Sequence, residues 1–243
     1  MDSKNQMNLQ CQICLSGHMA LLAELKDSEL ATLSSRKSRI TYKKGQILFY
    51  EGTKPMGLFC IHEGKVKVSQ INSNGKEQIL YLTKKDDFLG YRSLLSEEFY
   101  GATATVLEEA TICFIPKNDF LSVVSSNPIF LQKLMKEVCK KLGLMEKKLT
   151  QFSRNSVRER LAGTILMLKE TYGMEGEKSE LIDVLLTRED LANIVGTATE
   201  TVIRLLSEFK ADGLITLEGK RIKVLDTEQL AREADFYQKS FDQ

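Results

Sequence analysis

The 243-residue sequence has no tryptophan, three prolines and two histidines. It contains no phosphate-binding glycine loop, no nucleophile elbow and no pair of zinc-binding histidines on one helix. With His18 and His62 as the only imidazoles, acid–base catalysis would depend on carboxylates that show no distinctive pairing. The sequence therefore predicts a protein that is not an enzyme.

Long apolar runs are also missing. The longest, such as "LLAEL" and "GTILML", are far shorter than the ~20 residues of a membrane span. The first ten residues, "MDSKNQMNLQ", lack the basic and then apolar order of a secretory signal. We therefore expect a soluble, cytoplasmic protein with no membrane partner.

Five cysteines, an odd number, do not suit a disulfide framework. Cys11 and Cys14 form one close pair, so buried thiols and a metal site are the two alternatives.

Charge is balanced overall, with a formal net charge of +1. From Arg154 to the C-terminus there are 13 Lys and Arg residues and 17 Asp and Glu residues. If this half binds nucleic acid, its positive charge must be local, because phosphate attraction depends on where the cations lie. The length and the 42% hydrophobic content favour two domains.

The segment from about Ile40 to Pro116 has the pattern of closely spaced strands. Glycines recur between short runs such as "QILFY", "KVKVSQI" and "KEQILYL". This spacing of short apolar runs and turn residues is typical of an all-β roll or barrel.

A long amphipathic helix is predicted from Asn127 to about Phe152. Its apolar residues recur at spacings of three and four, which places them in one stripe. Such a stripe either packs on the β domain or pairs with a second copy, and the length of about seven turns favours a homodimer. The residues expected at this interface are Leu134, Val138, Leu142, Met145 and Leu149.

The C-terminal region reads as two short helices, a glycine turn and a β-hairpin. "LTREDLANIVG" gives a helix with Thr187 and Asp190 as a capping pair, and Gly196 turns the chain. "TATETVIRLLSEF" gives a second helix, with Thr197 as N-cap and Val202, Leu205, Leu206 and Phe209 buried. "LITLEGKRIKV" supplies two strands around Gly219, so the whole predicts a winged helix-turn-helix.

The residue types on the exposed face of the second helix are explained if that helix enters the DNA major groove. Arg204 can donate two hydrogen bonds to guanine, and Glu200 can accept from the cytosine amino group. Ile203 and the threonine methyl groups can contact thymine methyls. Lys220 and Arg221, at the tip of the hairpin, would contact phosphates.

The order β-roll, long helix and winged helix-turn-helix resembles the cAMP receptor protein and fumarate-nitrate regulator (Crp/Fnr) family of bacterial transcription factors. "VGTATETVIRLL", "GKRI", "KGQILFYEG" and "KKDDFLGYRSLLSE" are similar to its signature segments. The resemblance implies an α+β chain: a cyclic-nucleotide-binding-like β-roll (jelly roll) over residues 1–126, a dimerisation helix over 127–153 and a DNA-binding domain over 154–243. It implies double-stranded DNA and RNA polymerase as partners.

By this resemblance, the base-reading residues are Thr199, Glu200, Ile203 and Arg204. The residues expected on the DNA backbone are Thr187, Arg188, Thr197, Lys220 and Arg221. A sensor module that acts without DNA is the alternative class, and it leaves these residues unexplained.

The expected effector pocket contains Gly90, Tyr91, Arg92 and Ser93. Members of the family that bind cAMP carry a glutamate where Tyr91 stands and an Arg-Ser pair where Gly101 and Ala102 stand. A buried phosphate would lack its charge-assisted hydrogen bonds here. The sequence therefore disfavours cAMP.

Oxygen-sensing members of the family hold an iron-sulfur cluster with three N-terminal cysteines and one in the roll. Cys11, Cys14 and Cys113 match three of those positions, and the remaining N-terminal cysteine is missing. Because such clusters generally take four thiolates, the cluster remains an alternative to an organic effector. A zinc site at Cys11 and Cys14, or two thiols without a ligand, is also compatible with the sequence.

Overall fold

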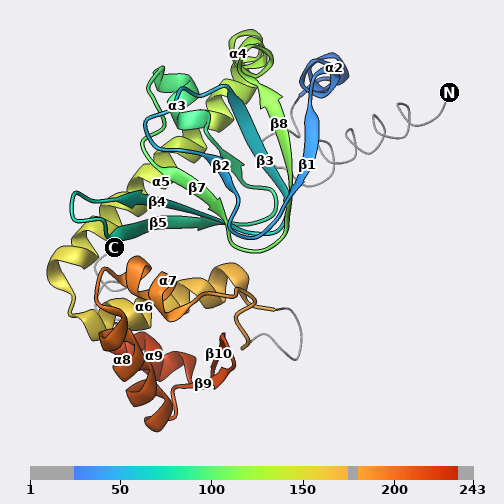
Figure 1. Cartoon of the computed structure of the whole chain (residues 1–243). Helices are drawn as coiled ribbons and strands as arrows, with labels where there is room; N and C mark the ends of the chain where they lie inside the picture. Colours follow the sequence, from blue (N-terminus) through green and yellow to red (C-terminus); the bar gives the residue numbers. More distant parts are fainter. Residues whose placement is uncertain (1–24, 175–179, 235–243) are drawn as a thin grey trace. The chain divides into compact units, whose positions relative to one another are not determined.

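The computed structural model describes residues 25–174 and 180–234, and they divide into two compact units (Figure 1). One unit comprises residues 25–70 and 80–144, and the other comprises residues 71–79 and 145–234. The elements are α2 (Asp27–Ser35), β1 (Ser38–Tyr42), β2 (Ile47–Phe49), β3 (Gly57–Glu63), β4 (Val66–Ile71), β5 (Glu77–Thr83), β6 (Phe88–Leu89), α3 (Tyr91–Ser96), β7 (Thr103–Val106), β8 (Ala110–Pro116), α4 (Lys117–Ser126), α5 (Pro128–Arg154), α6 (Val157–Tyr172), α7 (Arg188–Val195), α8 (Thr199–Ala211), β9 (Ile215–Glu218), β10 (Arg221–Val224) and α9 (Thr227–Glu233).

Strands β1 to β8 form the predicted roll as two four-stranded sheets, in the orders β1-β8-β3-β6 and β2-β7-β4-β5. Side chains alternate between the two faces of each strand, as a strand's period of two requires. In β3, Phe59 and Ile61 belong to a cluster that includes Val66 and Val68 of β4, so this cluster joins the two sheets. Leu58 and Cys60 point to the opposite face.

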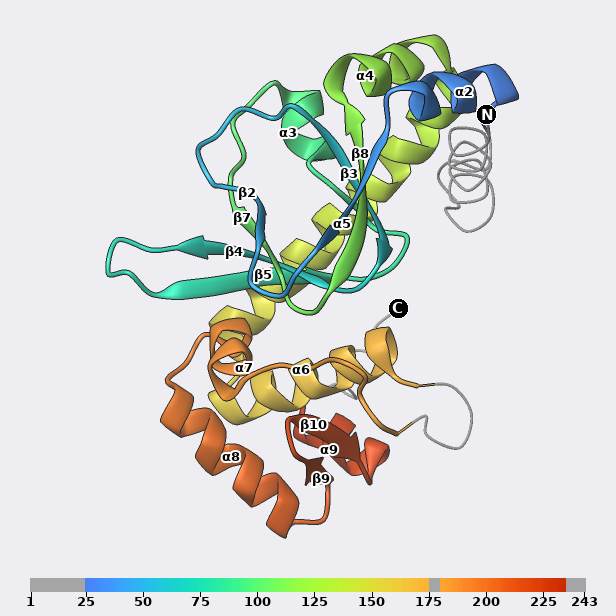
Figure 2. The same ribbon diagram turned by 45° about the vertical axis from the view of Figure 1, so that its right-hand side comes forward.

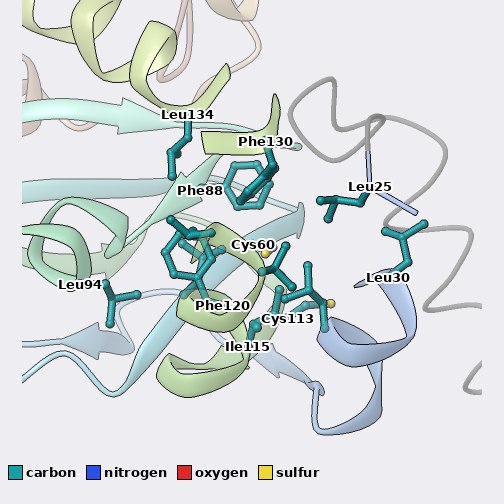
Figure 3. Packing of buried hydrophobic residues seen from close by; sticks show 14 residues of the cluster. Leu25, Leu30, Cys60, Phe88, Leu94, Cys113, Ile115, Phe120, Phe130 and Leu134 are labelled. Carbon is teal, nitrogen blue, oxygen red and sulfur yellow. The ribbon is translucent and has the colours of Figure 1, made fainter. Parts of the chain in front are cut away.

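The outer face of the first sheet packs against helices (Figure 3). Its cluster brings Cys60 and Cys113 of adjacent strands together with Leu25, Leu30 and the aromatic residues of α4 and α5. Phe120 and Phe130 meet edge to face, with ring centroids 6.4 Å apart. This packing fixes the first turns of α5 against the roll.

Helix α5 is one continuous helix, as predicted (Figure 2). Leu134 was expected in the dimer stripe, but it is 2% exposed and belongs to the core of the roll. Leu134 and Leu142 are eight residues apart and therefore lie about 80° apart around the helix.

The apolar stripe that α5 exposes differs from the predicted one at its N-terminal end, where Leu131 and Met135 replace Leu134. The positions alternate in steps of four and three residues, which is a heptad repeat. The stripe consists of Leu131, Met135, Val138, Leu142, Met145, Leu149 and Phe152, of which Val138 is half-buried and the others are exposed.

The second unit packs helices α6 to α9 around a core of its own, and β9 and β10 form an antiparallel hairpin. Leu161 and Ile165 of α6, Leu191 of α7 and Phe209 of α8 are at most 1% exposed. Within the described residues, no helix combines the length and apolar character of a membrane span.

Candidate DNA-binding site

Helix α7 begins with the predicted capping box. The Thr187 hydroxyl accepts from the backbone N–H of Asp190 at 2.9 Å, and the Asp190 carboxylate accepts from the Thr187 N–H at 3.0 Å. The helix ends at Gly196, whose φ of 73° is left-handed and therefore favours glycine. A short turn, Gly196 to Ala198, then leads into α8.

Thr197 does not cap α8, which corrects the sequence-based prediction. The N-cap is Ala198, and no side chain caps this helix. The Thr197 backbone N–H instead donates to the Ala192 carbonyl at 3.1 Å, which completes the end of α7. Helix α8 therefore begins one residue later than expected, and Glu200 is its second residue rather than its third.

Thr187, which caps α7, and Thr197, which caps no helix, provide a matched stability test. We expect Thr187→Ala to lower the free energy of unfolding by about 1 kcal/mol, because it removes a side-chain cap. Thr197→Ala should change it by only a few tenths of a kcal/mol, since that side chain caps nothing. Urea denaturation followed by circular dichroism checks both variants, and equal losses would contradict the assignment of the caps.

Helix α8 separates an apolar face from a polar one. Val202, Leu205, Leu206 and Phe209 are buried, as predicted. Glu200, Ile203 and Arg204 are exposed, and Thr199 is half-buried. The four predicted base-reading residues therefore share one accessible surface at the N-terminal half of the helix, a surface that a major groove can admit.

Arg204 is held in a network of ion pairs that sequence reasoning missed. Its Nη1 lies 2.5 Å from Glu208 Oε1, and Glu208 Oε2 lies 3.0 Å from Nη1 of Arg158 on α6. Arg158 also contacts Glu233 at 2.7 Å and Asp212 at 2.8 Å.

Arg158 therefore links helix α8 to α6 and α9. Its guanidinium lies 4.6 Å from the centre of the Phe209 ring, and its hydrogen bonds to Glu233 and Asp212 raise its pKa. In this arrangement Glu208 binds Nη1 of Arg204 and Nη1 of Arg158 at the same time.

A second arginine missed from the sequence supports the turn before α8. Arg160 Nε donates to the Val195 carbonyl at 3.0 Å, at the end of α7, and its Nη1 donates to the Asn155 carbonyl at 2.8 Å. Its guanidinium also lies 5.3 Å from the centre of the Phe152 ring. Arg160 thereby ties the last turn of α7 to the end of α5.

The predicted wing is present, and its two basic residues differ in their surroundings. Lys220 is exposed in the two-residue turn between β9 and β10. Arg221 opens β10, and its Nη2 lies 3.2 Å from Asp183. Arg188, the first residue of α7, is half-buried; its Nη1 lacks a hydrogen-bond partner among the described residues, and burial lowers its pKa. Of the three, Lys220 is the most accessible to a phosphate.

The four residues expected in an effector pocket lie where β6 joins α3. Ser93 is buried and donates to the Phe99 carbonyl at 3.3 Å, and the exposed Arg92 lies 3.2 Å from Glu98. The guanidinium of Arg92 also covers Gly101, where a Cβ atom would lie 2.6 Å from its Nη2. Gly101 therefore cannot become a larger residue unless Arg92 moves.

Of the predicted metal ligands, Cys113 lies in β8 and is 1% exposed. Its partner across the strands is Cys60 of β3. Cys11 and Cys14 lie outside the described residues. In the described ranges no three His, Cys, Asp or Glu side chains gather as a metal site would require.

Two family models match the two units. The cyclic nucleotide-binding domain matches residues 39–127, and the Crp-like helix-turn-helix domain matches residues 159–233. The chain is 28% identical over 229 residues to the fumarate and nitrate reduction regulatory protein of Escherichia coli (strain K12). The aligned region covers 93% of this chain and 90% of that protein.

Two further comparisons agree. The chain is 27% identical over 210 residues to the CRP-like cAMP-activated global transcriptional regulator of Mycobacterium tuberculosis (strain H37Rv), covering 86% of this chain and 94% of that protein. Its fold is similar to that of FixK2 from Bradyrhizobium japonicum, with a TM-score of 0.73, 18% identity, and coverage of 81% and 96% of the two chains.

A cyclic-nucleotide-binding type of roll joined by a long helix to a helix-turn-helix defines a DNA-binding transcriptional regulator. The chain belongs to the Crp/Fnr family of transcriptional regulators. The family and the fold class predicted from the sequence are thereby confirmed.

Proposed function

We propose that the protein binds a two-fold symmetric DNA site as a homodimer and reads bases with Thr199, Glu200, Ile203 and Arg204 of α8. The observation that carries this proposal is the accessible polar surface of α8 above a fully apolar buried face. Lys220 contacts a phosphate from the wing, and Thr187, Arg188, Thr197 and Arg221 are the other proposed backbone contacts. RNA polymerase is the proposed protein partner.

The homodimer forms through the exposed heptad stripe of α5. Leu142 and Leu149 are 59% and 73% exposed, and they belong to a continuous apolar row along a helix of 27 residues. Burying such a stripe against a second copy removes apolar surface from water. A parallel pair of α5 helices then relates two copies of α8 by a two-fold axis.

Selection of bound duplexes from a random-sequence pool tests this function. A two-fold dimer presents its α8 helices to successive major-groove faces, so half-sites should be centred about one helical turn apart. Enriched sequences should therefore be palindromes with that spacing. A pool that shows no enrichment, or only an unpaired half-site, would contradict the proposal.

The effector is a molecule other than cAMP. Gly101 and Ala102 occupy the positions where members that bind cAMP carry an Arg-Ser pair, so neither position supplies a charge. The nearby Arg92 already lies beside Glu98. Aromatic rings fill the inside of the roll: Phe49 stacks on Tyr100 with centroids 3.9 Å apart, and burial raises the pKa of Tyr100 to about 12. Apart from Arg92, which is paired with Glu98, a cyclic phosphate would find apolar and uncharged groups in this part of the roll.

Isothermal titration calorimetry checks this expectation. We expect no specific binding of cAMP at micromolar concentrations, because a buried phosphate would lose its water without gaining charged partners. The cAMP-activated regulator of Mycobacterium tuberculosis, run in parallel, serves as the positive control. A micromolar dissociation constant, with DNA affinity raised by the ligand, would overturn the expectation.

A second candidate function is oxygen or redox sensing through a metal or iron-sulfur site that includes Cys113. Leu25, the first residue described after the Cys11–Cys14 pair, packs in the same buried cluster as Cys113. Cys60 stands opposite Cys113 in the next strand and is a further thiol at that place. When bound, a cluster would supply an oxygen-sensitive redox centre, and Cys11, Cys14 and Cys113 are the cysteines that would hold it.

The visible absorption spectrum of protein purified without oxygen tests the second candidate. Cysteine-bound iron and sulfide should absorb in the visible range and bleach in air, and Cys113→Ser should abolish the colour. Iron and acid-labile sulfide assays provide an independent readout. A colourless, iron-free sample from iron-replete cells would rule out the cluster.

A further inference from the structure

A cleft of about 550 Å³ lies between the loop that joins β5 to β6 and the first half of α5, within the first unit. Its volume falls in the range of ~300–1,000 Å³ that is typical of small-molecule sites. Of the four residues expected to form the effector pocket, only Tyr91 lines it. The cleft is therefore separate from the predicted pocket at Arg92 and Ser93.

The cleft has an apolar floor and a cationic rim. The floor consists of side chains that are at most 9% exposed: Leu58, Phe88, Phe120, Phe130 and Leu134. Figure 3 shows the last four of these packed together. The charged lining comprises Lys84, Lys85, Lys133, Lys136, Lys140 and Lys141, with Asp86, Asp87 and Glu137 as the acidic residues. The lining of the cleft thus carries six ammonium groups and three carboxylates.

Local contacts engage part of this charge, and the excess of cations remains. Glu137 lies 2.8 Å from Lys140 Nζ, and Asp87 accepts from the backbone N–H of Lys84 at 2.9 Å. Lys141 Nζ lies 5.0 Å from the centre of the Tyr91 ring. The cations come from two separate elements, the loop and the helix, so an anion between them would be attracted from both sides.

The cleft would stay open in the proposed dimer. Lys140 follows Leu131 by nine residues, which is about two and a half turns, so it lies on the side of α5 opposite the exposed stripe. Pairing of two α5 helices through the stripe therefore leaves Lys133, Lys136 and Lys140 of the rim accessible, while Lys141 borders the stripe.

We propose that this cleft binds an amphiphilic organic anion, with an apolar or aromatic body over the floor and a carboxylate, sulfonate or phosphate group at the rim. Lysine ammonium groups are point charges on flexible stems and accept anionic groups of differing geometry. The cleft lies in the first unit alone, so binding there is independent of how α8 reads DNA.

The probe for this site is 8-anilinonaphthalene-1-sulfonate, an aromatic sulfonate whose fluorescence rises in apolar surroundings. We expect one saturable site per chain. The variant Lys85→Glu/Lys136→Glu reverses one charge on each wall and should weaken binding by about tenfold or more, since it replaces two attractions with two repulsions. N-phenyl-1-naphthylamine, which has the same rings without the sulfonate, should bind at least about tenfold more weakly.

The matched control is Lys44→Glu/Lys147→Glu, which makes the same charge change on one loop and on α5 outside the cleft. It should bind the sulfonate probe like the unaltered protein, and circular dichroism should show native melting for both variants. Unchanged affinity in the cleft variant, or equal binding of the uncharged probe, would overturn the proposal.

Discussion

Replacement of Arg204 by alanine should weaken binding to the selected DNA by about 1–3 kcal/mol per half-site and relax the preference at one base pair. The arginine can donate two hydrogen bonds to guanine N7 and O6, and alanine can donate none. Fluorescence anisotropy at fixed salt should be recorded for the selected duplex and for duplexes changed at each base pair. The expected signature is a loss of discrimination at the guanine position with the other positions unaffected.

The matched control is Lys210→Ala, which removes an exposed cation from the C-terminal end of the same helix. It should weaken binding to all duplexes by the same factor, if at all, because base edges are contacted from the N-terminal half of a recognition helix. If the Arg204 variant keeps the full base preference, α8 is not the element that reads the sequence.

Replacement of Leu142 by glutamate should convert the protein to monomers at micromolar concentration. The substitution places a charge in the middle of the exposed stripe, where pairing would bury it against apolar side chains. Sedimentation velocity should give a single species of about the chain mass, 27.5 kDa. DNA affinity should fall strongly in parallel, because a monomer contacts one half-site.

Leu144→Glu is the control for this experiment. Leu144 is 57% exposed, nearly as exposed as Leu142, but it lies outside the heptad positions of the stripe. It should remain dimeric with native DNA affinity. A dimeric Leu142 variant, or a monomeric unaltered protein both free and on DNA, would show that α5 does not pair.

Local sequence patterns predict much of the fold. Alternating apolar residues in "KVKVSQI" predict a strand, and Thr187 with Asp190 predicts the start of α7, since each pattern acts over a few residues. The buried face of α8 follows from the helical period in the same way. The error at Thr197 arose because Gly196 and Thr197 both bond to Ala192, a backbone event that side-chain identity does not encode.

Features that depend on distant segments were not predictable. Leu134 fits a stripe by spacing, but the roll covers that side of α5, so tertiary contact decides its place. The partners of Arg158 lie 50 to 75 residues further along the chain, and "VRER" alone gives no signal for them. The same holds for the cationic cleft. Its two walls are the loop between β5 and β6 and the helix α5, which are separated along the chain by elements that include α3 and α4.

Methylation interference on the selected duplex tests the central claim most directly, since N7-methylguanine cannot accept a hydrogen bond from Arg204 in the major groove. The unaltered protein should show strong interference at two guanines related by the two-fold axis and about one helical turn apart. With Arg204→Ala, interference at those two guanines should disappear while binding persists at lower affinity. Interference that is absent from the unaltered protein, asymmetric, or unchanged in the variant would contradict the assignment of α8 as the DNA-reading helix.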